Sequence, residues 1–558
     1  MGDRTRRIAI GMAALLLLAH VALAGWAIQA QSPTFDEPFH IAGGWAALRH
    51  GDYDFQAAWH PPLAELIAVA PYLFRSQPPI LDRNSRAYAE RSYFVAADDF
   101  LHRNRVPADV LLHSARWALY LALFPVLAFV LYRFAESLHP GAGAWSLVLL
   151  ALEPNLLAHA TLVTTDFAAA TFFFAAFVTL GNHLREPSPG RAALTGAAWA
   201  ASLLSKYSNL TAGFGVLLLF FAARKRLAAD LKILRLLGVT ALACAGCFLL
   251  AYRFDSVACW IDGVRGMLML ANLGRPKFFL GAHSIEPIPA YYPILLAMKT
   301  GFPHLLLAAG GAWAILRARA EPIPRWIPTL AIGVPAVHLF FASTSSVQLG
   351  IRYVLQVYPF LIALGAVAAG RLAEGSGTRS VLRRAGLAAA LLWAAIGLGR
   401  SAPWFIAHFN ETAGGAQGSY RCFTDSNNDW GQGLPALGKY LERQGVRSIW
   451  LAYFGMGKPE FYGIRYVPIG MWRTSLHPGD PNAAPEKEPK QYFAVSGTHL
   501  MGTYWQQHDL LEWLRGRAPE AFLGGSIFLY DLTGDAAALA RVEALSQLSA
   551  PEKAREVF

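Results

Sequence analysis

Apolar segments close to twenty residues long recur along most of this chain, and they constrain its fold more than any other feature. A helix needs about twenty mainly apolar residues to cross the roughly 30 Å hydrocarbon core of a bilayer. The segments that approach this length are 8–30, 112–133, 143–160, 167–183, 193–206, 209–223, 236–252, 293–315, 327–343, 351–370 and 385–402. The sequence therefore predicts a polytopic α-helical membrane protein with about eleven transmembrane helices.

The composition agrees with a membrane location. Of the 558 residues, 55% are hydrophobic and 15% are charged, whereas about 25% of residues are charged in soluble domains. The net charge of +11 does not indicate nucleic-acid binding, because the basic residues lie in short clusters between apolar segments. The first apolar segment is longer than the roughly 7–15-residue core of a signal peptide and has no small-residue cleavage site, so it is predicted to be the first membrane helix.

The basic clusters predict the orientation. If successive helices alternate in direction, every cluster lies on one side of the membrane, which the positive-inside rule assigns to the cytoplasm. The clusters are Arg4, Arg6 and Arg7; Arg185 and Arg191; Arg224, Lys225, Arg226, Lys232 and Arg235; Arg317, Arg319 and Arg325; and Arg371, Arg379, Arg383 and Arg384. We therefore expect a multi-pass protein of the inner (plasma) membrane, with a cytoplasmic N-terminus and long extracytoplasmic (periplasmic) segments.

Two of these outer segments are too long to be simple connectors. The first, 31–111, contains HPPLAELIAVAPYLF, whose apolar stretch is short and flanked by proline, so it predicts an amphipathic helix along the membrane surface. The second, 403–558, alternates β-rich runs such as SIWLAYFG, QYFAVSG and GGSIFLYDL with helical runs such as GLPALGKYLERQG and DLLEWLRGRAP. It is predicted to be a soluble α/β domain that follows a membrane domain of residues 1–402.

The four cysteines give little information about function. Cys244 and Cys247 lie inside an apolar segment, where packing is favoured over redox or metal chemistry. Cys259 and Cys422 are expected on the same outer side, so a disulfide between them is left open. No set of acidic residues requires a metal, and no metal or other cofactor is predicted.

Acidic residues at the outer ends of two predicted helices are candidate catalytic groups. Asp36 and Glu37 follow the first apolar segment directly, and Asp166 lies in LVTTDF. Thr34 and Glu37 also match a capping box, and Asp166 matches a helix N-cap. These interpretations do not exclude catalysis, because a carboxylate at a helix start has the fixed position that a general base needs. Ionisable groups near membrane depth are costly, which favours a functional role.

Three basic residues are expected on the same side as these acids. Arg116 begins the second span, Lys206 lies in an outer turn, and Arg352 lies at the start of the tenth predicted span. Each alone is explained by a long side chain that reaches the lipid headgroups. If all three face one cavity, they predict a phosphate site, and at the membrane boundary that phosphate belongs to a lipid.

In combination, FDEPFHIAGG, HPPLAELI, the arginine that opens the second span and LVTTD resemble the dolichyl-phosphate-mannose protein O-mannosyltransferases. They are equally similar to bacterial relatives that use polyprenyl-phosphate sugars, including the lipid A aminoarabinose transferases. The resemblance covers about residues 8–402 and extends to KTGFP at Lys299 and RYVLQVYPFL at Arg352, where Gln356 replaces an expected proline. FNETAGG and TDSNNDWGQGLPAL resemble a block in bacterial members with an extracytoplasmic C-terminal domain.

The resemblance implies a GT-C-type fold, a cavity that faces away from the cytoplasm, a polyprenyl-phosphate-linked sugar donor and no metal. We therefore predict an inverting glycosyl transfer to an extracytoplasmic hydroxyl of a protein, glycan or lipid acceptor, with membrane lipids as further partners and no nucleic acid. The predicted roles are Asp36 as general base, Glu37 and Asp166 as orienting carboxylates, Arg116, Lys206 and Arg352 as ligands of the donor phosphate, and His60 as a residue that positions the loop.

Other functions are compatible with parts of the sequence. A transporter or lipid flippase with a periplasmic domain would show inverted repeats and interrupted helices, and Glu153-Pro154 is the nearest candidate for an interruption. A sugar-lipid sensor on the same fold would not need the acids. The segment 421–435 is open between a sugar-binding site and a hydrogen-bonded turn that starts the next helix, and the turn is favoured.

Overall fold

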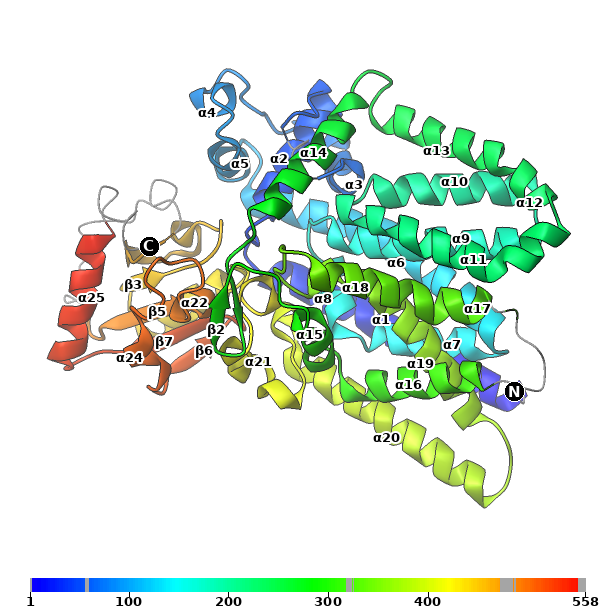
Figure 1. Ribbon diagram of the computed structural model, residues 1–558. Coiled ribbons are helices and arrows are strands. Elements are labelled where there is room, and N and C mark those ends of the chain that lie inside the picture. The colour runs from blue at the N-terminus through cyan, green and yellow to red at the C-terminus, as the bar shows by residue number, and fades with distance from the viewer. Residues whose placement is uncertain are drawn as a thin grey trace.

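The computed structural model describes residues 3–55, 60–317, 324, 326–471, 485 and 488–549. Long helices fill the first part of the chain, and a small sheet with short helices follows them (Figure 1). Seven of the described helices are long and apolar enough to cross a membrane. They are α1 (Asp3–Ala30), α6 (Ala108–Leu138), α9 (Asp166–Arg185), α12 with α13 (Lys232–Arg235 and Leu237–Ala251), α17 to α18 (Trp326–Pro328, η3 Thr329–Gly333 and Val334–Thr344), η5 with α19 (Leu355–Val357 and Tyr358–Ala373) and α20 (Thr378–Ser401).

An eighth span is interrupted. The helices α15 (Tyr291–Lys299) and α16 (Phe302–Leu316) pass the same test only as a pair, and they bend by 113° at the break. Pro303 lies in the first turn of α16, where proline can start a helix but does not continue one. Shorter helices complete this part: α7 (Ala142–Ala151), α8 (Pro154–Ala160), α10 (Pro189–Leu203), η2 (Tyr207–Thr211), α11 (Ala212–Ala229) and α14 (Ala258–Asn272).

Each predicted apolar segment is mainly helical, but the predicted number of spans, about eleven by length and apolarity, is not confirmed. The segment 143–160 is divided into α7 and α8. The Glu153 carboxylate accepts a hydrogen bond from Leu156 N at 2.6 Å and caps α8, and Pro154 is the first residue of that helix. The local sequence therefore ends one helix and starts another where a continuous span was expected.

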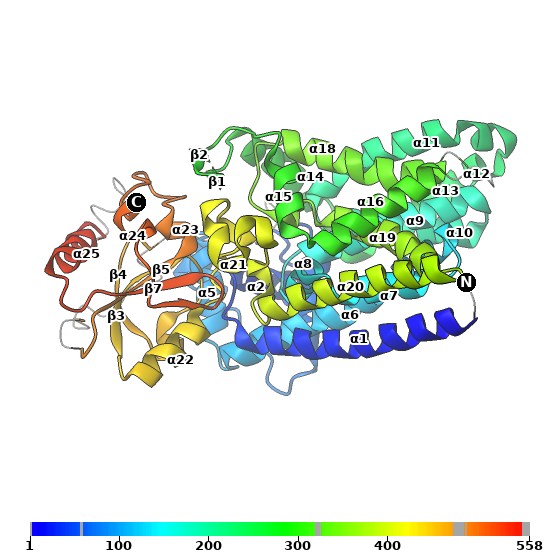
Figure 2. The same cartoon turned by 90° about the horizontal axis from the view of Figure 1, so that it is seen from below.

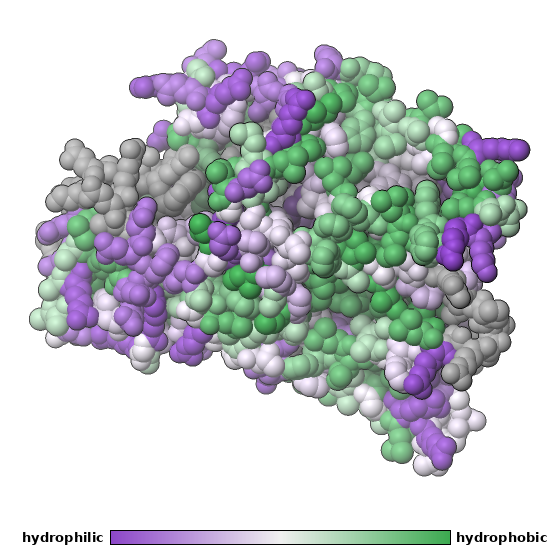
Figure 3. Space-filling model, in the orientation of Figure 1, coloured by the Kyte–Doolittle hydropathy of each residue, from purple (hydrophilic) through white to green (hydrophobic). Residues whose placement is uncertain are grey.

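The basic and the sheet-containing ends of the molecule lie opposite each other. Figure 1 shows the N-terminus, α12 and the start of α20 at the right, and the C-terminal sheet at the left. From below, α1, α6 and α20 extend along this axis (Figure 2). An apolar surface lies over the helices between the two ends (Figure 3). Large apolar side chains that are exposed on the helices include Leu18, Leu121, Phe129, Leu217, Phe221, Leu242 and Leu392. In the predicted clusters, Arg319, Arg325 and the side chain of Arg4 lie outside the described residues.

The first outer loop forms several short helices beside the membrane part. They are α2 (Glu37–His50), α3 (Leu63–Val69), η1 (Ala70–Phe74), α4 (Arg86–Ala89) and α5 (Tyr93–His102). α3 packs against α2 and α6, and it buries Ala64, Ala68 and Val69. In η1, Phe74 is 88% exposed. The predicted short amphipathic helix is thus present, with one face on the protein and apolar residues at its end open to lipid.

The C-terminal part contains a five-stranded sheet of strand order β4-β3-β5-β7-β6. β3 pairs in parallel with β4 and β5, and β7 pairs antiparallel with β5 and β6. The strands are β3 (Ser448–Ala452), β4 (Arg465–Pro468), β5 (Tyr492–Ser496), β6 (Ala521–Leu523) and β7 (Ile527–Asp531), and the helices are α22 (Leu434–Gln444), α23 (Gly497–Leu500), α24 (Glu512–Arg515) and α25 (Ala536–Leu548). The predicted runs for β3, β5, β7 and α22 are confirmed.

The chain between the last span and the sheet forms short turns that pack on the membrane part. They are η6 (Phe405–Ala407), η7 (Glu411–Ala413), α21 (Gly415–Gly418), η8 (Ser419–Arg421) and η9 (Asp425–Asn427), with η10 (Pro459–Tyr462) further on. A hairpin of β1 (Lys277–Phe279) and β2 (Ala282–Ser284) lies beside them, and Phe279 bridges to Phe423. All four cysteines are free thiols, so Cys259 and Cys422 form no disulfide.

Gly311 lets α16 approach α19 closely. A Cβ on Gly311 would lie 1.8 Å from the carbonyl oxygen of Leu364, whereas a Cβ on Gly310 would meet only Ala368 at 3.5 Å. We expect Gly311→Ala to lower the free energy of unfolding by about 1–3 kcal/mol, because the added methyl group overlaps backbone. Gly310→Ala is the matched control and should change it by less than about 0.5 kcal/mol. Thermal unfolding of both purified variants measures this, and equal melting temperatures would contradict the close approach.

Candidate active site

Glu37 and Arg116 form a fully buried ion pair. Arg116 donates to both carboxylate oxygens of Glu37, at 2.8 Å from Nε and 2.6 Å from a terminal nitrogen. Its other N–H groups donate to the carbonyl oxygens of Ile28, Gln31 and Ser32 at 2.9–3.0 Å. A guanidinium has five N–H donors, and all five have a protein acceptor here. Arg116 therefore has no donor left for a phosphate, and its predicted role is better filled by other residues.

The carboxylate of Glu37 is equally occupied. It also accepts hydrogen bonds from the backbone N–H groups of Thr34 and Val163, both at 2.8 Å. The contact to Thr34 is the reach-back that the capping-box interpretation expected. The N-cap of α2 is nevertheless Asp36, and the Thr34 hydroxyl donates to Glu37 at 3.0 Å. Glu37 thus ties the end of α1 to the turn before α9, and this geometry does not favour its predicted role in orienting substrate hydroxyls.

Asp36 lies at the edge of a second group of charges and pairs with Arg352. Its Oδ2 is 2.6 Å from a terminal nitrogen of Arg352, which belongs to η4 (Ile351–Tyr353) just before the span of α19. The side chain of Asp36 is 24% exposed, whereas those of Glu37 and Asp166 are 0% and 1% exposed. Among the three predicted carboxylates, Asp36 is therefore the most accessible one.

Asp166 and Lys206 form another ion pair, beside the pair of Asp36 and Arg352. The Nζ of Lys206 is 2.5 Å from Asp166 Oδ1, and it lies 4.1 Å from the centre of the Tyr353 ring. The guanidinium of Arg352 lies 5.3 Å from the same ring. Asp36, Arg352, Lys206 and Asp166 are thus gathered around Tyr353. The predicted convergence of acids and cations is present, with Arg116 and Glu37 set apart in their own pair.

Several buried polar atoms in this group have no hydrogen-bond partner. They include Oδ2 of Asp166, Nε of Arg352 and Nδ1 of His159. Most buried polar atoms in folded proteins are paired, so unpaired ones that gather in one place require an explanation. An acceptor and a donor of opposite charge, left unpaired beside two ion pairs, suit a polar ligand with both hydroxyl groups and negative oxygens.

The two motifs of the first outer loop meet in a histidine–carboxylate cluster. Nδ1 of His40 is 2.9 Å from Glu65 Oε1, and the ring of His60 lies 4.7 Å from the ring of His40. His40 and Glu65 are buried. His60, predicted to position the loop, is therefore in contact with α2, the helix that begins directly after Asp36.

Burial controls the protonation of this cluster. It raises the pKa of Glu65 to about 7, against a smaller opposing effect of His40. Burial also lowers the pKa of His40, but the hydrogen bond and charge of Glu65 more than offset this and raise it above its ordinary value of 6.5. The pKa of His60 falls well below its ordinary range through burial and the nearby charge of His40.

The segment 421–435 reaches this site from the C-terminal part of the chain. Its η9 turn is closed by hydrogen bonds from the N–H groups of Asn428 and Asp429 to Asp425 O at 3.0 and 2.9 Å. The ring of Trp430 lies 4.4 Å from the guanidinium carbon of Arg352. The segment is therefore a hydrogen-bonded turn before α22, in line with the favoured interpretation, and it also contacts the charged group.

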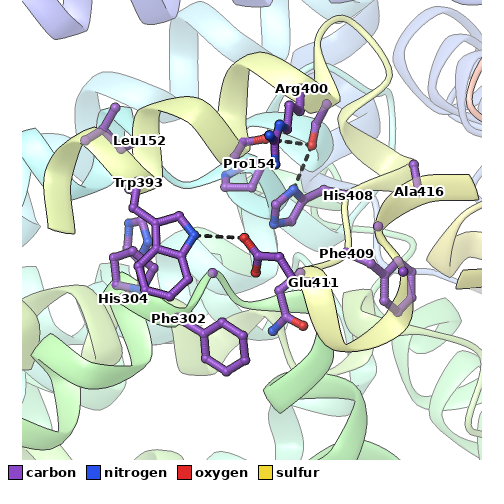
Figure 4. A pocket seen from close by; sticks show the side chains of 18 of the residues that line it. Leu152, Pro154, Phe302, His304, Trp393, Arg400, His408, Phe409, Glu411 and Ala416 are labelled. Carbon is purple, nitrogen blue, oxygen red and sulfur yellow. Dashed lines mark hydrogen bonds between the residues drawn. The ribbon is translucent and has the colours of Figure 1, made fainter. Parts of the chain in front are cut away.

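A separate pocket lies among α16, α20 and the turns after residue 407 (Figure 4). Its volume is about 440 Å³, and it contains none of the predicted site residues. On its wall, Trp393 Nε1 donates to Glu411 Oε1 at 2.8 Å, and His408 contacts Ser401 at 2.7 Å. Its contacts do not connect it with the chemistry around Asp36.

Sequence reasoning missed several residues of the site. His40 and Glu65 stand inside the two motifs that drew attention to the loop, and Tyr353 follows Arg352 directly, so their spacing was a usable signal. His159 gave none, although it lies only seven residues before Asp166. Trp430 was considered only as a sugar ligand within the segment 421–435. Within the described residues, no group of three or more His, Cys, Asp or Glu side chains is arranged to hold a metal ion.

The chain resembles three solved structures in its fold. ArnT from Cupriavidus metallidurans aligns in the apo state over 94% of this chain and 98% of its own, with 13% identity and a TM-score of 0.49. Its form bound to undecaprenyl phosphate aligns over 93% and 98%, with 14% identity and a TM-score of 0.47. The apo oligosaccharyltransferase of Archaeoglobus fulgidus aligns over 68% and 55%, with 11% identity and a TM-score of 0.42.

No protein-family model matches the sequence, and comparison with curated proteins finds no relative.

Removal of one partner of the buried ion pair should destabilise the protein. We expect Glu37→Gln to lower the free energy of unfolding by about 3–5 kcal/mol, because it leaves the Arg116 charge buried without a counter-charge. Glu90→Gln removes an ion pair with Arg86 whose side chains are 57% and 88% exposed, and it should cost less than about 1 kcal/mol. Denaturation of both variants in the same detergent measures the difference; a Glu37→Gln protein as stable as Glu90→Gln would show that the pair is not structural.

The His40–Glu65 pair should make stability depend on pH. Between its ordinary value of 4.5 and about 7, Glu65 keeps its proton in the folded state but loses it in the unfolded state. The folded state therefore binds more protons in this window, and stability falls as the pH rises through it. His40, with its raised pKa, extends the decline above pH 6.5. We expect the melting temperature to fall more steeply between pH 5 and 8 in the wild type than in Glu65→Gln; parallel curves would remove the pair as the cause.

Proposed function

We propose that this protein is an integral-membrane glycosyltransferase of the GT-C type, which moves a monosaccharide from a polyprenyl-phosphate donor to an extracytoplasmic hydroxyl with inversion. The observation that carries the proposal is the charged group around Tyr353, in which a partly exposed carboxylate, Asp36, lies beside a buried cation with an unpaired N–H, Arg352. A base and a phosphate ligand in contact are what this reaction needs.

Arg352 and Lys206 are the proposed ligands of the donor phosphate, and Arg116 is not. Arg352 has an unpaired Nε, and Lys206 lies 4.1 Å from the centre of the Tyr353 ring that Arg352 also contacts. Arg352 precedes the span of η5 and α19, and Asp166 begins the span of α9. Cations at the outer ends of spans suit a phosphate whose lipid chain remains in the bilayer. A lipid-linked sugar is also a donor that can be presented outside the cytoplasm, where nucleotide sugars are absent.

The ion pair between Asp36 and Arg352 gives a means to activate the base. A phosphate that takes the guanidinium of Arg352 competes with Asp36 for it and leaves the carboxylate free for the acceptor hydroxyl. The acceptor oxygen then attacks the anomeric carbon, its proton passes to Asp36, and the bond from that carbon to the phosphate oxygen breaks. The charge on the departing polyprenyl phosphate is balanced by Arg352 and Lys206. Asp166 keeps an unpaired oxygen that is suited to orient a sugar hydroxyl.

The proposed arrangement in the cell follows the distribution of charge. The basic loops lie in the cytoplasm, and the site and the C-terminal domain lie outside an inner (plasma) membrane. Residues 1–402 form the catalytic membrane domain, and residues 403–558 form the extracytoplasmic domain. The acceptor is a protein, a glycan or a lipid with a free hydroxyl.

Substitution of Asp36 tests the proposal. In membranes given radiolabelled polyprenyl-phosphate sugars, we expect Asp36→Asn to lower label transfer by a factor of about 100 or more at unchanged protein level, because the amide cannot accept the proton. Asp262→Asn is the matched control, since Asp262 pairs with Arg265 on an exposed face of α14. Transfer by Asp36→Asn at a rate close to that of the control would exclude Asp36 as the base.

A transporter or flippase is the second candidate function. The specific observation in its favour is the 113° break between α15 and α16, because interrupted helices line the substrate sites of many transporters. Reconstituted vesicles separate the two functions. Label that crosses the bilayer while still attached to the polyprenyl phosphate indicates transport, and label that appears on an acceptor indicates transfer.

A further inference from the structure

The turn that carries Arg352 is held by the C-terminal part of the chain. We propose that the segment Asp425–Trp430 is a positioning element for Arg352, so that binding of a lipid phosphate at the active site depends on the docked C-terminal domain. This inference rests on the proposed function for the identity of the ligand. The positioning itself stands on contacts between the two parts of the chain.

Two hydrogen bonds fix the backbone of the turn. The hydroxyl of Ser426 donates to Leu349 O at 2.7 Å, and the N–H of Ile351 donates to Asn427 Oδ1 at 3.1 Å. Gly350 lies between them with φ of 150°, and a Cβ there would be 2.6 Å from the Ser426 oxygen. The residue before Ile351 must therefore lack a side chain for the segment to come this close.

Trp430 fixes the side chain of Arg352. The indole is 1% exposed and its ring lies 4.4 Å from the guanidinium carbon, the geometry of a cation–π contact. The carbonyl oxygen of Trp430 also accepts a hydrogen bond from the N–H of Phe35 at 2.9 Å. Phe35 directly precedes Asp36. Trp430 thus contacts Arg352 through its ring, and through its backbone it contacts the residue that precedes Asp36.

Lys299 anchors the segment to the membrane part. Its Nζ donates to the carbonyl oxygens of Ile406 and Asn427 at 2.8 and 2.5 Å, and the amide of Asn427 donates to the hydroxyl of Tyr291 at 3.1 Å. Lys299 is 1% exposed and ends α15 at the interrupted span. A buried lysine that donates hydrogen bonds to two carbonyl groups holds these chain segments together. The hydrogen bond from Lys299 to Asn427 therefore links the KTGFP motif with the DSNND block.

Binding of a lipid phosphate to the purified full-length chain tests the inference. In nanodiscs, we expect Trp430→Ala to weaken binding of a long-chain polyprenyl phosphate about tenfold and Trp430→Phe to weaken it less, because a smaller ring keeps part of the contact. Binding of the uncharged polyprenol should not change. Trp450→Phe, at a tryptophan of β3 that is 3% exposed, is the matched control for the stability of the domain and should bind as the wild type does. Wild-type affinity in Trp430→Ala would overturn the inference.

A double-mutant cycle shows whether Trp430 acts through Arg352. If it does, adding Trp430→Ala to Arg352→Gln should weaken phosphate binding by less than twofold beyond Arg352→Gln alone, whereas independent effects would multiply.

Hydrogen exchange separates failure of the inference from failure of the proposed function. We expect the N–H of Ile351 to exchange faster in Asn427→Ala than in the wild type, while the amides of β3 are unchanged. If the wild type does not bind the phosphate lipid but this change is seen, the proposed function fails and the positioning stands. Unchanged exchange at Ile351 would overturn the positioning.

Discussion

The buried ion pair of Glu37 and Arg116 is the contact on which the rest of the site depends. Its hydrogen bonds join the last turn of α1, the first turn of α2, the interior of α6 and the N–H of Val163 before α9. Asp36 precedes Glu37 directly, and Asp166 lies three residues after Val163. Both carboxylates of the charged group around Tyr353 are therefore placed by a pair that lies outside that group. A charge pair with all its hydrogen-bonding groups satisfied is rigid, which is what a positioning contact requires.

The charges around Tyr353 differ from this pair in one physical respect: they are incompletely satisfied. Arg352 pairs with Asp36 through a terminal nitrogen and leaves its Nε buried and unpaired. Asp166 pairs with Lys206 through Oδ1 and leaves its Oδ2 buried and unpaired. Buried charges are costly unless they are paired and hydrogen-bonded. The unpaired atoms of Arg352 and Asp166 therefore lower the stability of the fold. The two arginines show the contrast. Arg116 is saturated and serves the fold, and Arg352 is unsaturated and is suited to bind.

The sequence predicted the fold class, because the length and apolarity of the spans are local properties. It also predicted that Asp36, Asp166, Lys206 and Arg352 come together. It did not predict which cation pairs with which acid, since an arginine at the start of a span looks the same whether it meets a ligand or Glu37. The number of spans was missed where Glu153 and Pro154 divide an apolar segment by capping, which apolarity alone does not reveal. Trp430 was considered as a sugar ligand, but its contact with Arg352 was not predicted, because the two residues are far apart in the sequence.

The segment that contains Trp430 docks on the membrane part, so the two parts of the chain are not independent. A soluble domain attached by a linker would leave the membrane site complete without it. Here Asn427 and Ser426 supply the hydrogen bonds of the turn before α19, and Lys299 receives its acceptors from beyond the last span. Loss of the C-terminal part would leave Nζ of Lys299 buried without two of its acceptors and Arg352 without its aromatic contact. The same few contacts therefore hold the domain in place and fix the geometry of Arg352. A substitution that weakens one of these effects also changes the other.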